Sequence, residues 1–273
     1  MKLTYLGTAA AEGFPAVFCN CKHCQEARRL KGKNIRTRSQ AMINDDLLLD
    51  LPADTYSHFL QNDIDGDRIK YLLVTHSHLD HFYGDELLMR YGAFARDMRV
   101  DQLAVYCGAG VGNKIQNSGI LKPGTVSCQV LNPFDTVTFG DYTVTALPAR
   151  HHIGDNALFY IIQGDKTILY AHDTGYFYEE VFAFIEQHGY VFDLISLDCT
   201  NIDIPISDEG SHMGLDNIQR VVERLEKMGA VTKKTQKVIN HFSHNAAPIH
   251  HKLEERVQEY GYLVSYDGMC LEV

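Results

Sequence analysis

The sequence predicts an α/β protein in which two packed β-sheets are flanked by helices. Short apolar, β-branched segments recur along the chain, and the early ones follow one another in runs. Later segments mix with amphipathic stretches, but without the regular strand–helix alternation of a TIM barrel or a Rossmann fold. Because the 273 residues contain no low-complexity tract and no Pro-rich linker, we expect one domain over residues 1–273.

Nine segments have strand character and two have helical character. The expected strands are residues 2–7, 46–51, 69–75, 142–149, 157–163, 166–173, 192–198, 237–242 and 262–266. One helix is expected between Gly214 and Gly229, where apolar residues recur at helical spacing. A second is expected to begin near Pro248 and to end at Gly261.

The composition favours a soluble enzyme that does not bind nucleic acid. A formal net charge of −10 disfavours a polyanionic partner. The stretch from Arg28 to Arg38 holds six basic residues and no acid, which fits solvated surface better than a phosphate site. No apolar run approaches the length of a membrane span, and the N-terminus enters strand-like alternation at once, so we expect a cytoplasmic protein.

Three of the seven cysteines fall within six residues, in the stretch CNCKHC from Cys19 to Cys24. An odd count and this close spacing suit a metal site better than a disulfide framework. The remaining four are scattered and are expected to be buried free thiols: Cys107, Cys128, Cys199 and Cys270.

The strongest motif is THSHLDH, residues 75–81, which directly follows the apolar run YLLV. Alternation points His76 and His78 the same way, while Asp80 and His81 come on the next turn as a helix begins. Burying so many imidazoles and carboxylates is costly unless they bind a cation. The motif therefore predicts a metal site, with ligands for two adjacent cations.

Further candidate ligands follow the later strands. They are His151 and His152 after LPAR, His172 and Asp173 after LYA, and His241 and His244 in NHFSH. His152 and His172 each stand beside a better candidate, so we expect them to be surface residues or to support the ligands from behind.

The order of these residues resembles the metallo-β-lactamase fold superfamily over essentially the whole chain. The resemblance implies an αββα four-layer sandwich and a dinuclear centre. It assigns His76, His78 and His151 to one metal, and Asp80, His81 and His241 to the other. Asp173 would bridge the two, and Asp50 would orient the histidine loop by hydrogen bonds.

A narrower resemblance is to the phosphoribosyl cyclic phosphate phosphodiesterases of the carbon–phosphorus lyase pathway of phosphonate metabolism. It rests on GTAAAEGFPAVFCNCKHCQEARR and GSHMGLDNIQRV. The first segment implies a structural zinc loop at about residues 13–26. Its expected ligands are Cys19, Cys21, Cys24 and His244, with His23 as the alternative fourth ligand. The second segment makes His212 the expected general acid.

The ligand motif predicts a metal-dependent hydrolase, and the narrower resemblance implies that it cleaves a small, cyclic ribosyl phosphodiester. The expected catalytic residues are His212, Asp80 and Asp173. Two divalent cations, zinc or manganese, would act beside one structural zinc. The same metal ligands could also serve hydrolysis of a thioester or a lactone, or RNA processing. A diiron oxidoreductase or a metal-containing binding protein agrees less well with the sequence. The sequence leaves the oligomeric state open, including a homodimer.

Overall fold

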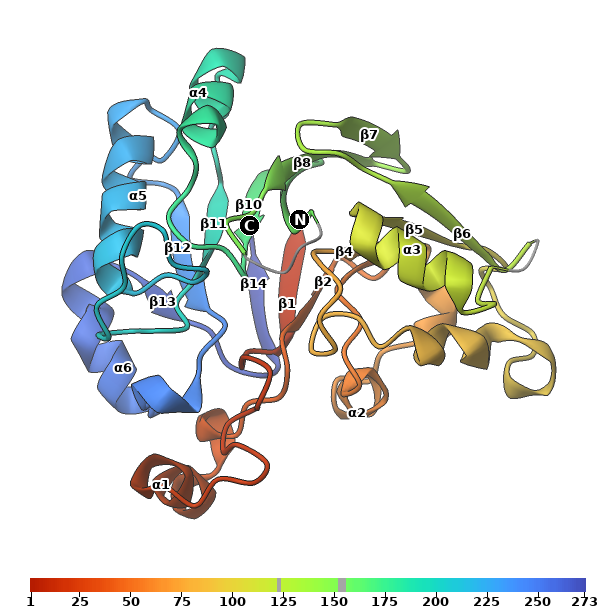
Figure 1. Ribbon diagram of the computed structural model, residues 1–273, viewed down its shortest axis with the longest axis horizontal. Helices are drawn as coiled ribbons and strands as arrows, with labels where there is room; N and C mark the ends of the chain where they lie inside the picture. The colour runs from red at the N-terminus through yellow and green to blue at the C-terminus, as the bar shows by residue number, and fades with distance from the viewer. Residues whose placement is uncertain (122–123, 152–155) are drawn as a thin grey trace.

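The computed structural model describes residues 1–121, 124–151 and 156–273 and shows two seven-stranded sheets packed face to face (Figure 1). The first sheet runs β14-β1-β2-β3-β4-β5-β6 and the second β13-β12-β11-β10-β9-β8-β7. In Figure 1, α4, α5 and α6 lie on one side of the sandwich and α2 and α3 on the other. The predicted αββα architecture is therefore confirmed.

The bounds of the elements are as follows. The first sheet contains β1 (Lys2–Gly7), β2 (Gln40–Ile43), β3 (Leu47–Leu49), β4 (Tyr71–Val74), β5 (Leu103–Cys107), β6 (Val126–Val130) and β14 (Met269–Glu272). The second contains β7 (Thr136–Phe139), β8 (Tyr142–Pro148), β9 (Leu158–Gln163), β10 (Thr167–Ala171), β11 (Leu194–Asp198), β12 (Gln236–Asn240) and β13 (Leu263–Val264). The α-helices are α1 (Lys22–Leu30), α2 (Thr55–Gln61), α3 (Ala109–Asn117), α4 (Glu179–His188), α5 (Leu215–Lys227) and α6 (His250–Val257). Short 3₁₀ helices are η1 (Gly32–Asn34), η2 (Gly66–Arg68), η3 (Gly84–Arg90), η4 (Gly92–Phe94), η5 (His244–Ala246) and η6 (Gln258–Tyr260).

Central strands are buried on both faces, which explains their continuous apolar sequence. In β3, Leu47 and Leu49 join the core between the sheets, whereas Leu48 joins the cluster on the opposite face, with residues of α3. In β10, Ile168 and Tyr170 face the other sheet, while Leu169 and Ala171 join the cluster that contains residues of α4, α5 and α6. Such two-sided burial is the rule for sheets covered by helices.

Parallel pairing brings the carboxyl ends of the central strands together. β3, β4 and β5 pair in parallel in the first sheet, and β10, β11 and β12 in the second. β8 and β10 are both antiparallel to β9, so β8 ends on the same side as β10. Chemistry-bearing side chains that follow these strands are thereby gathered at one edge of the sandwich.

Each predicted strand and helix is present, but the stretch after His81 differs from the expected helix. Residues Gly84–Arg90 form the 3₁₀ helix η3 instead of an α-helix. The sequence reasoning also passed over β2, β5, β6, β7 and β14. Within the described residues, no helix is long and apolar enough to cross a membrane.

The expected burial of four cysteines and the expected exposure of the basic stretch are each confirmed only in part. Cys107 and Cys199 are buried as expected, but Cys128 is half-buried and Cys270 is exposed. Strand β14 lies at the edge of its sheet, and alternation turns Met269 inward and Cys270 outward, so the expected burial of Cys270 is wrong. In the basic stretch, Arg28, Arg29, Lys31 and Lys33 are exposed, as expected of solvated surface, whereas Arg36 has a structural role. The buried Arg36 guanidinium donates to Thr8 Oγ1 (2.9 Å) and the Ser265 carbonyl (2.6 Å).

Candidate metal centre

Two groups of histidine and aspartate side chains meet at the carboxyl edge of the sheets. The first group is His76, His78 and His151, and the second is Asp80, His81 and His241. In each group, one potential ligand atom per residue lies within 4.8 Å of the others. The histidine motif supplies residues to both groups from the end of β4, and the second sheet completes each of them.

The first group opens toward solvent. His76 Nε2 and His151 Nε2 lie 3.0 and 3.2 Å from His78 Nδ1. His76 is buried and His151 half-buried, whereas His78 is exposed. Three ring nitrogens thus converge on a position that a substrate can approach from the surface.

The second group is buried throughout. His81 Nε2 lies 3.3 Å from both His241 Nε2 and Asp80 Oδ2. All three residues are buried, so a cation held there is shielded from bulk water.

Asp173 lies between the two groups, as expected for a bridging ligand. Its Oδ2 is 2.8 Å from Nε2 of both His81 and His241, while its Oδ1 is 3.9 Å from His151 Nε2 and 4.0 Å from His76 Nε2. Although Oδ2 is buried, it accepts no hydrogen bond of normal geometry from any described residue. One oxygen therefore faces each group, and the inner one lacks the partner that a cation would supply.

Hydrogen bonds behind the histidines leave their Nε2 atoms free to act as ligands. Asp50 Oδ2 lies 2.7 Å from His81 Nδ1, and Asp50 Oδ1 accepts from the Thr75 backbone N–H (2.8 Å). Thr200 Oγ1 lies 2.8 Å from His241 Nδ1. When Nδ1 carries the proton, Nε2 presents its lone pair inward, which is the usual arrangement of histidine ligands. Asp50 thus contacts the histidine loop from behind, and its role of orienting metal ligands stays a prediction.

Asp198, at the end of β11, is a site residue that the sequence reasoning missed. Its Oδ2 accepts from the Asp173 backbone N–H (3.0 Å) and lies 3.1 Å from His212 Nδ1, and its Oδ1 accepts from Thr200 N and Met213 N (both 3.0 Å). A signal was present, because FDLISLD ends an apolar strand with aspartate, as DLLLD does at Asp50. Asp198 therefore fixes three segments of the site.

The charge of this region suits cations. Four buried carboxylates, those of Asp50, Asp80, Asp173 and Asp198, lie within it, and no lysine or arginine of the described chain forms an ion pair with them. Burial opposes protonation of His81, but the charges of Asp173, Asp50 and Asp80 outweigh it and raise its pKa well above the usual range. Buried carboxylates without cationic side chains are costly unless metal ions neutralise them. The donor set therefore fits two divalent metals.

His212 lies at the mouth of this centre. Its ring stacks on His241 with centroids 5.6 Å apart and meets His151 edge to face at 5.0 Å. Burial lowers its pKa, but the Asp198 charge and hydrogen bond more than compensate, and the result is a pKa of about 9. Because Nδ1 faces Asp198, Nε2 is the ring nitrogen left for a bound molecule.

Three residues of the site adopt left-handed backbone conformations within two residues of the end of a strand. They are Asp50 (φ 65°), Asp173 (φ 51°) and His241 (φ 65°). Non-glycine residues rarely adopt such conformations, and each costs about 1 kcal/mol or more. The chain accepts this strain where it turns a ligand or its supporting carboxylate into the centre.

His172 and His152 were expected to be surface residues or to support the ligands from behind. His172 is buried, and its Nε2 lies 2.7 Å from Ser196 Oγ while its Nδ1 accepts from the Asn240 side-chain amide (3.2 Å). Burial and His241 lower its pKa to about 3, so it is a neutral residue behind the ligands. His152 lies outside the described residues.

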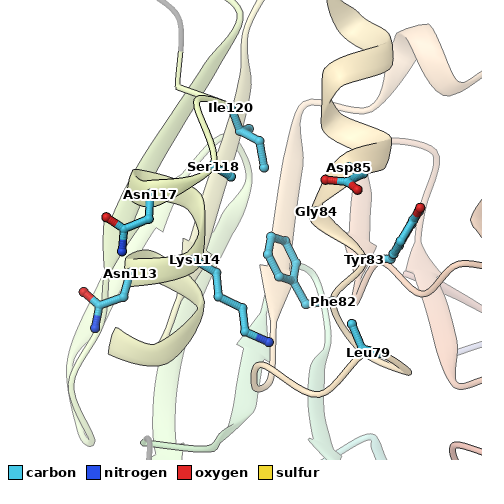
Figure 2. Close-up of a pocket in the computed structure, with 10 residues that line it drawn as sticks. All are labelled: Leu79, Phe82, Tyr83, Gly84, Asp85, Asn113, Lys114, Asn117, Ser118 and Ile120. Atoms are coloured by element: carbon cyan, nitrogen blue, oxygen red, sulfur yellow. The ribbon is translucent and has the colours of Figure 1, made fainter.

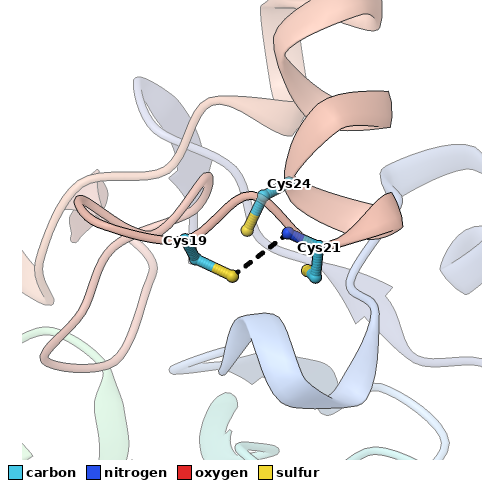
Figure 3. A group of neighbouring side chains, drawn as sticks. All are labelled: Cys19, Cys21 and Cys24. Atoms are coloured by element: carbon cyan, nitrogen blue, oxygen red, sulfur yellow. Dashed lines mark hydrogen bonds between the residues drawn. The ribbon is translucent and has the colours of Figure 1, made fainter.

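The cysteines form a separate cluster at the start of α1 (Figure 3). The sulfur atoms of Cys19, Cys21 and Cys24 lie within 4.8 Å of one another, and Cys19 Sγ accepts a hydrogen bond from the Cys21 N–H (3.4 Å). A hydrogen bond from the Cys24 N–H lowers the pKa of the Cys21 thiol to about 7, although burial opposes the shift. Three thiols at this spacing fit a tetrahedral zinc site that needs one more ligand.

The predicted fourth ligand, His244, is held by a residue that the sequence reasoning did not single out. Glu12 Oε1 lies 2.9 Å from His244 Nδ1 and accepts from the His244 N–H (3.1 Å) and from Ser243 Oγ (2.6 Å). A carboxylate on Nδ1 leaves Nε2 as the ligand nitrogen. The choice between His244 and His23 stays a prediction.

Comparisons with known proteins agree with this geometry. Residues 51–242 match the beta-lactamase superfamily domain, a range that includes the seven predicted ligands of the dinuclear centre. A UPF0173 protein of Pyrococcus abyssi is 27% identical over 117 residues, which are 42% of this chain and 49% of that protein, so the match spans about half of the relative's length.

Solved structures show the same fold along the chain. A diphosphatase of the PhnP family superposes with a TM-score of 0.75 at 20% identity, covering 100% of this chain and 97% of that one. Zn²⁺-bound PqqB from Methylobacterium extorquens gives 0.77 at 18% identity, with both chains fully covered. Yeast PDE1 gives 0.63 at 12% identity, covering 100% of this chain and 99% of that one. The chain therefore belongs to the beta-lactamase superfamily and has the fold of its metal-dependent hydrolases.

Proposed function

We propose that this protein is a dinuclear metal-dependent phosphodiesterase that hydrolyses a small, cyclic ribosyl phosphodiester. The observation that carries the proposal is the position of His212. This histidine, held by Asp198, lies against His151 of the first ligand group, which reaches solvent at His78. Hydrolysis of a diester of an alkyl alcohol needs such a proton donor, because an alkoxide is a poor leaving group.

The residues of the chain divide the work between them. His76, His78 and His151 would hold one zinc or manganese ion, Asp80, His81 and His241 the other, and Asp173 both. When bound, two such cations acidify a water molecule and stabilise charge on a phosphoryl oxygen. His212 Nε2 donates a proton to the departing oxygen, while the Asp198 carboxylate holds Nδ1 and stabilises the charged ring.

Two likenesses support the finer assignments. The CxCxxC loop suggests a structural zinc on Cys19, Cys21 and Cys24, closed by His244. The likeness to a diphosphatase of the PhnP family, which covers the whole chain, favours a phosphate ester over a thioester or a lactone. The net charge of −10 favours a small diester over RNA.

Leaving-group dependence tests the proposed role of His212. In His212→Ala, turnover of a methyl or ribosyl phosphodiester is expected to fall ~10²- to 10⁴-fold, the range typical of a lost general acid. Turnover of bis(p-nitrophenyl) phosphate is expected to fall much less, because nitrophenolate leaves without a proton. His251→Ala, which removes an exposed histidine, is the matched control.

Metal content tests the centre itself. Mass spectrometry of the untagged protein is expected to find about three metals per chain, and Asp80→Asn is expected to lose metal and diesterase activity together. The exposed Asp101→Asn serves as the control. If the protein binds its metals but has no diesterase activity, thioesters and lactones become the substrates to test. In the leaving-group experiment, equal losses of turnover on both substrates in His212→Ala would show that His212 is not the general acid.

A further inference from the structure

A charged hydrogen bond ties the histidine loop to helix α3. The Lys114 ammonium group of α3 donates to the carbonyl oxygen of Ser77, which lies between His76 and His78 in the sequence. Figure 2 shows the Lys114 side chain extending from α3 toward the segment that carries Leu79. Within the described chain, Lys114 forms no ion pair with a carboxylate, so no acid draws its ammonium group away from this carbonyl.

His78 differs from the other candidate histidine ligands in what lies behind its ring. Each of the other four has a hydrogen-bonding partner on the ring nitrogen that points away from its ligand group. These partners are Thr75 Oγ1 for His76 (3.0 Å), Asp50 Oδ2 for His81 (2.7 Å), the Ser211 carbonyl for His151 (3.3 Å) and Thr200 Oγ1 for His241 (2.8 Å). His78 turns Nδ1 toward His76 and His151, and its Nε2 has no hydrogen-bonding partner within the described residues. The position of the His78 ring therefore depends on its backbone.

The backbone around His78 is held at both of its peptide groups. On the C-terminal side, the His78 carbonyl oxygen accepts from the N–H groups of His81 (3.0 Å) and Phe82 (2.7 Å). On the N-terminal side, the Ser77 carbonyl and the His78 N–H belong to one planar peptide group, so the bond from Lys114 fixes the orientation of that plane. His78 is exposed, and a charged donor holds a carbonyl more strongly than the neutral water that would replace it.

We propose that Lys114 is a positioning residue for the metal of the first ligand group. It holds the Ser77–His78 peptide so that His78 Nδ1 stays directed at the position between His76 and His151, and it takes the place of the ring partner that the other histidines have. The inference rests on the dinuclear centre of the proposed function and is independent of the substrate. Loss of a contact that supports a metal ligand typically weakens metal affinity about 10- to 100-fold.

Zinc retention at buffered free zinc concentrations tests this inference. Mass spectrometry of the metal-loaded protein counts the zinc per chain at each concentration. In Lys114→Met, one zinc is expected to require ~10- to 100-fold more free zinc than in the wild type, while the others keep their affinity. Lys114→Arg, which keeps a cationic donor, is expected to restore most of the affinity. Lys233→Met, which changes an exposed lysine elsewhere, is expected to leave it unchanged.

A double variant identifies the ligand through which Lys114 acts. His78→Ala removes the ligand itself and weakens the same zinc. If Lys114 acts through His78, adding Lys114→Met to His78→Ala is expected to cause no further loss of zinc affinity. Additive losses would show that Lys114 acts elsewhere and would overturn the inference.

Other roles of Lys114 give different results. If Lys114 only stabilises the fold, zinc affinity in Lys114→Met falls equally at all positions, and urea unfolding of the metal-free variant shows the lost stability. If its charge only repels the cations, Lys114→Met binds zinc more tightly than the wild type. Either result, or an unchanged zinc affinity, would overturn the inference.

Turnover separates this inference from the proposed function. If the wild type retains its zinc but hydrolyses no diester, the phosphodiesterase is rejected, and the zinc affinities of the Lys114 variants still decide the role of this residue. If the wild type hydrolyses a diester and Lys114→Met retains zinc as the wild type does, the inference alone fails.

Discussion

Replacement of Asp198 by asparagine tests whether one buried carboxylate organises the catalytic edge. Its Oδ1 accepts from Thr200 N and Met213 N, and asparagine can keep both bonds with its carbonyl oxygen. The amide NH₂ then takes the place of Oδ2, which in the wild-type protein accepts from the Asp173 N–H and lies beside His212 Nδ1. An NH₂ group cannot accept these hydrogen bonds. The buried Asp173 N–H loses its acceptor at roughly 1 to 3 kcal/mol, and His212, whose side chain is 27% exposed, adds less, so the variant is expected to lose about 2 kcal/mol or more of unfolding free energy.

The pH dependence of stability gives this prediction a sign. Burial alone raises the pKa of Asp198, but His212 and its hydrogen bond lower it overall below the usual value. A carboxyl group with a depressed native pKa stabilises the fold above its unfolded pKa, at about 4, and that stabilisation is lost as the pH falls through the native pKa. The Asp198→Asn variant lacks this contribution, so its deficit is expected to be largest near neutral pH and to shrink in acid.

Urea unfolding of metal-free protein at several pH values provides the measurement. Metal-free samples isolate the hydrogen bonds from metal affinity, and Asp101→Asn is the exposed control. Loss of the His212 orientation is expected to lower alkyl diester turnover at least tenfold as well. A variant with wild-type stability at pH 7, or a deficit that grows in acid, would refute the reasoning.

Two further predictions concern other parts of the fold. Cys21→Ser is expected to lose one zinc per chain and to lower the melting temperature, because structural zinc contributes on the order of 10 kcal/mol to folding in small zinc domains; mass spectrometry and calorimetry check both, and unchanged zinc and melting would reject the site. Gly175→Ala is expected to destabilise the protein and displace the His212 loop, because a Cβ there would stand 1.8 Å from the Gly210 carbonyl oxygen; thermal unfolding checks it, and a wild-type melting temperature would contradict it.

The sequence predicted which side chains meet at the centre, because each follows an apolar strand as a titratable residue, while their roles as ligands stay predictions. Titratable side chains are costly to bury at the end of an apolar strand. They stand out there in the motif from His76 to His81, and again at Asp173 and His241. Asp198 carries the same signal, but sequence spacing alone does not show that its strand ends beside those of Asp173 and His241. That information lies in the parallel pairing of β10, β11 and β12.

The missed elements have a different cause. β7 is an edge strand of only four residues, TVTF, in which the two threonines are exposed, so its alternation of polar and apolar residues is too short to stand out. Glu12 and Lys114 each act through a contact with a residue far away in the chain, His244 and Ser77 respectively. Such contacts exist only once the fold has formed, and no local pattern announces them.

The spread of the candidate ligands along the chain ties the metal centre to the packing of the two sheets. In each ligand group, two residues follow β4 of the first sheet, and the third, His151 or His241, follows a strand of the second sheet. Neither sheet alone therefore brings the three side chains of a group together. Because an ion that binds only the folded state stabilises that state, a metal held by either group would stabilise the contact between the two sheets as well as the site itself.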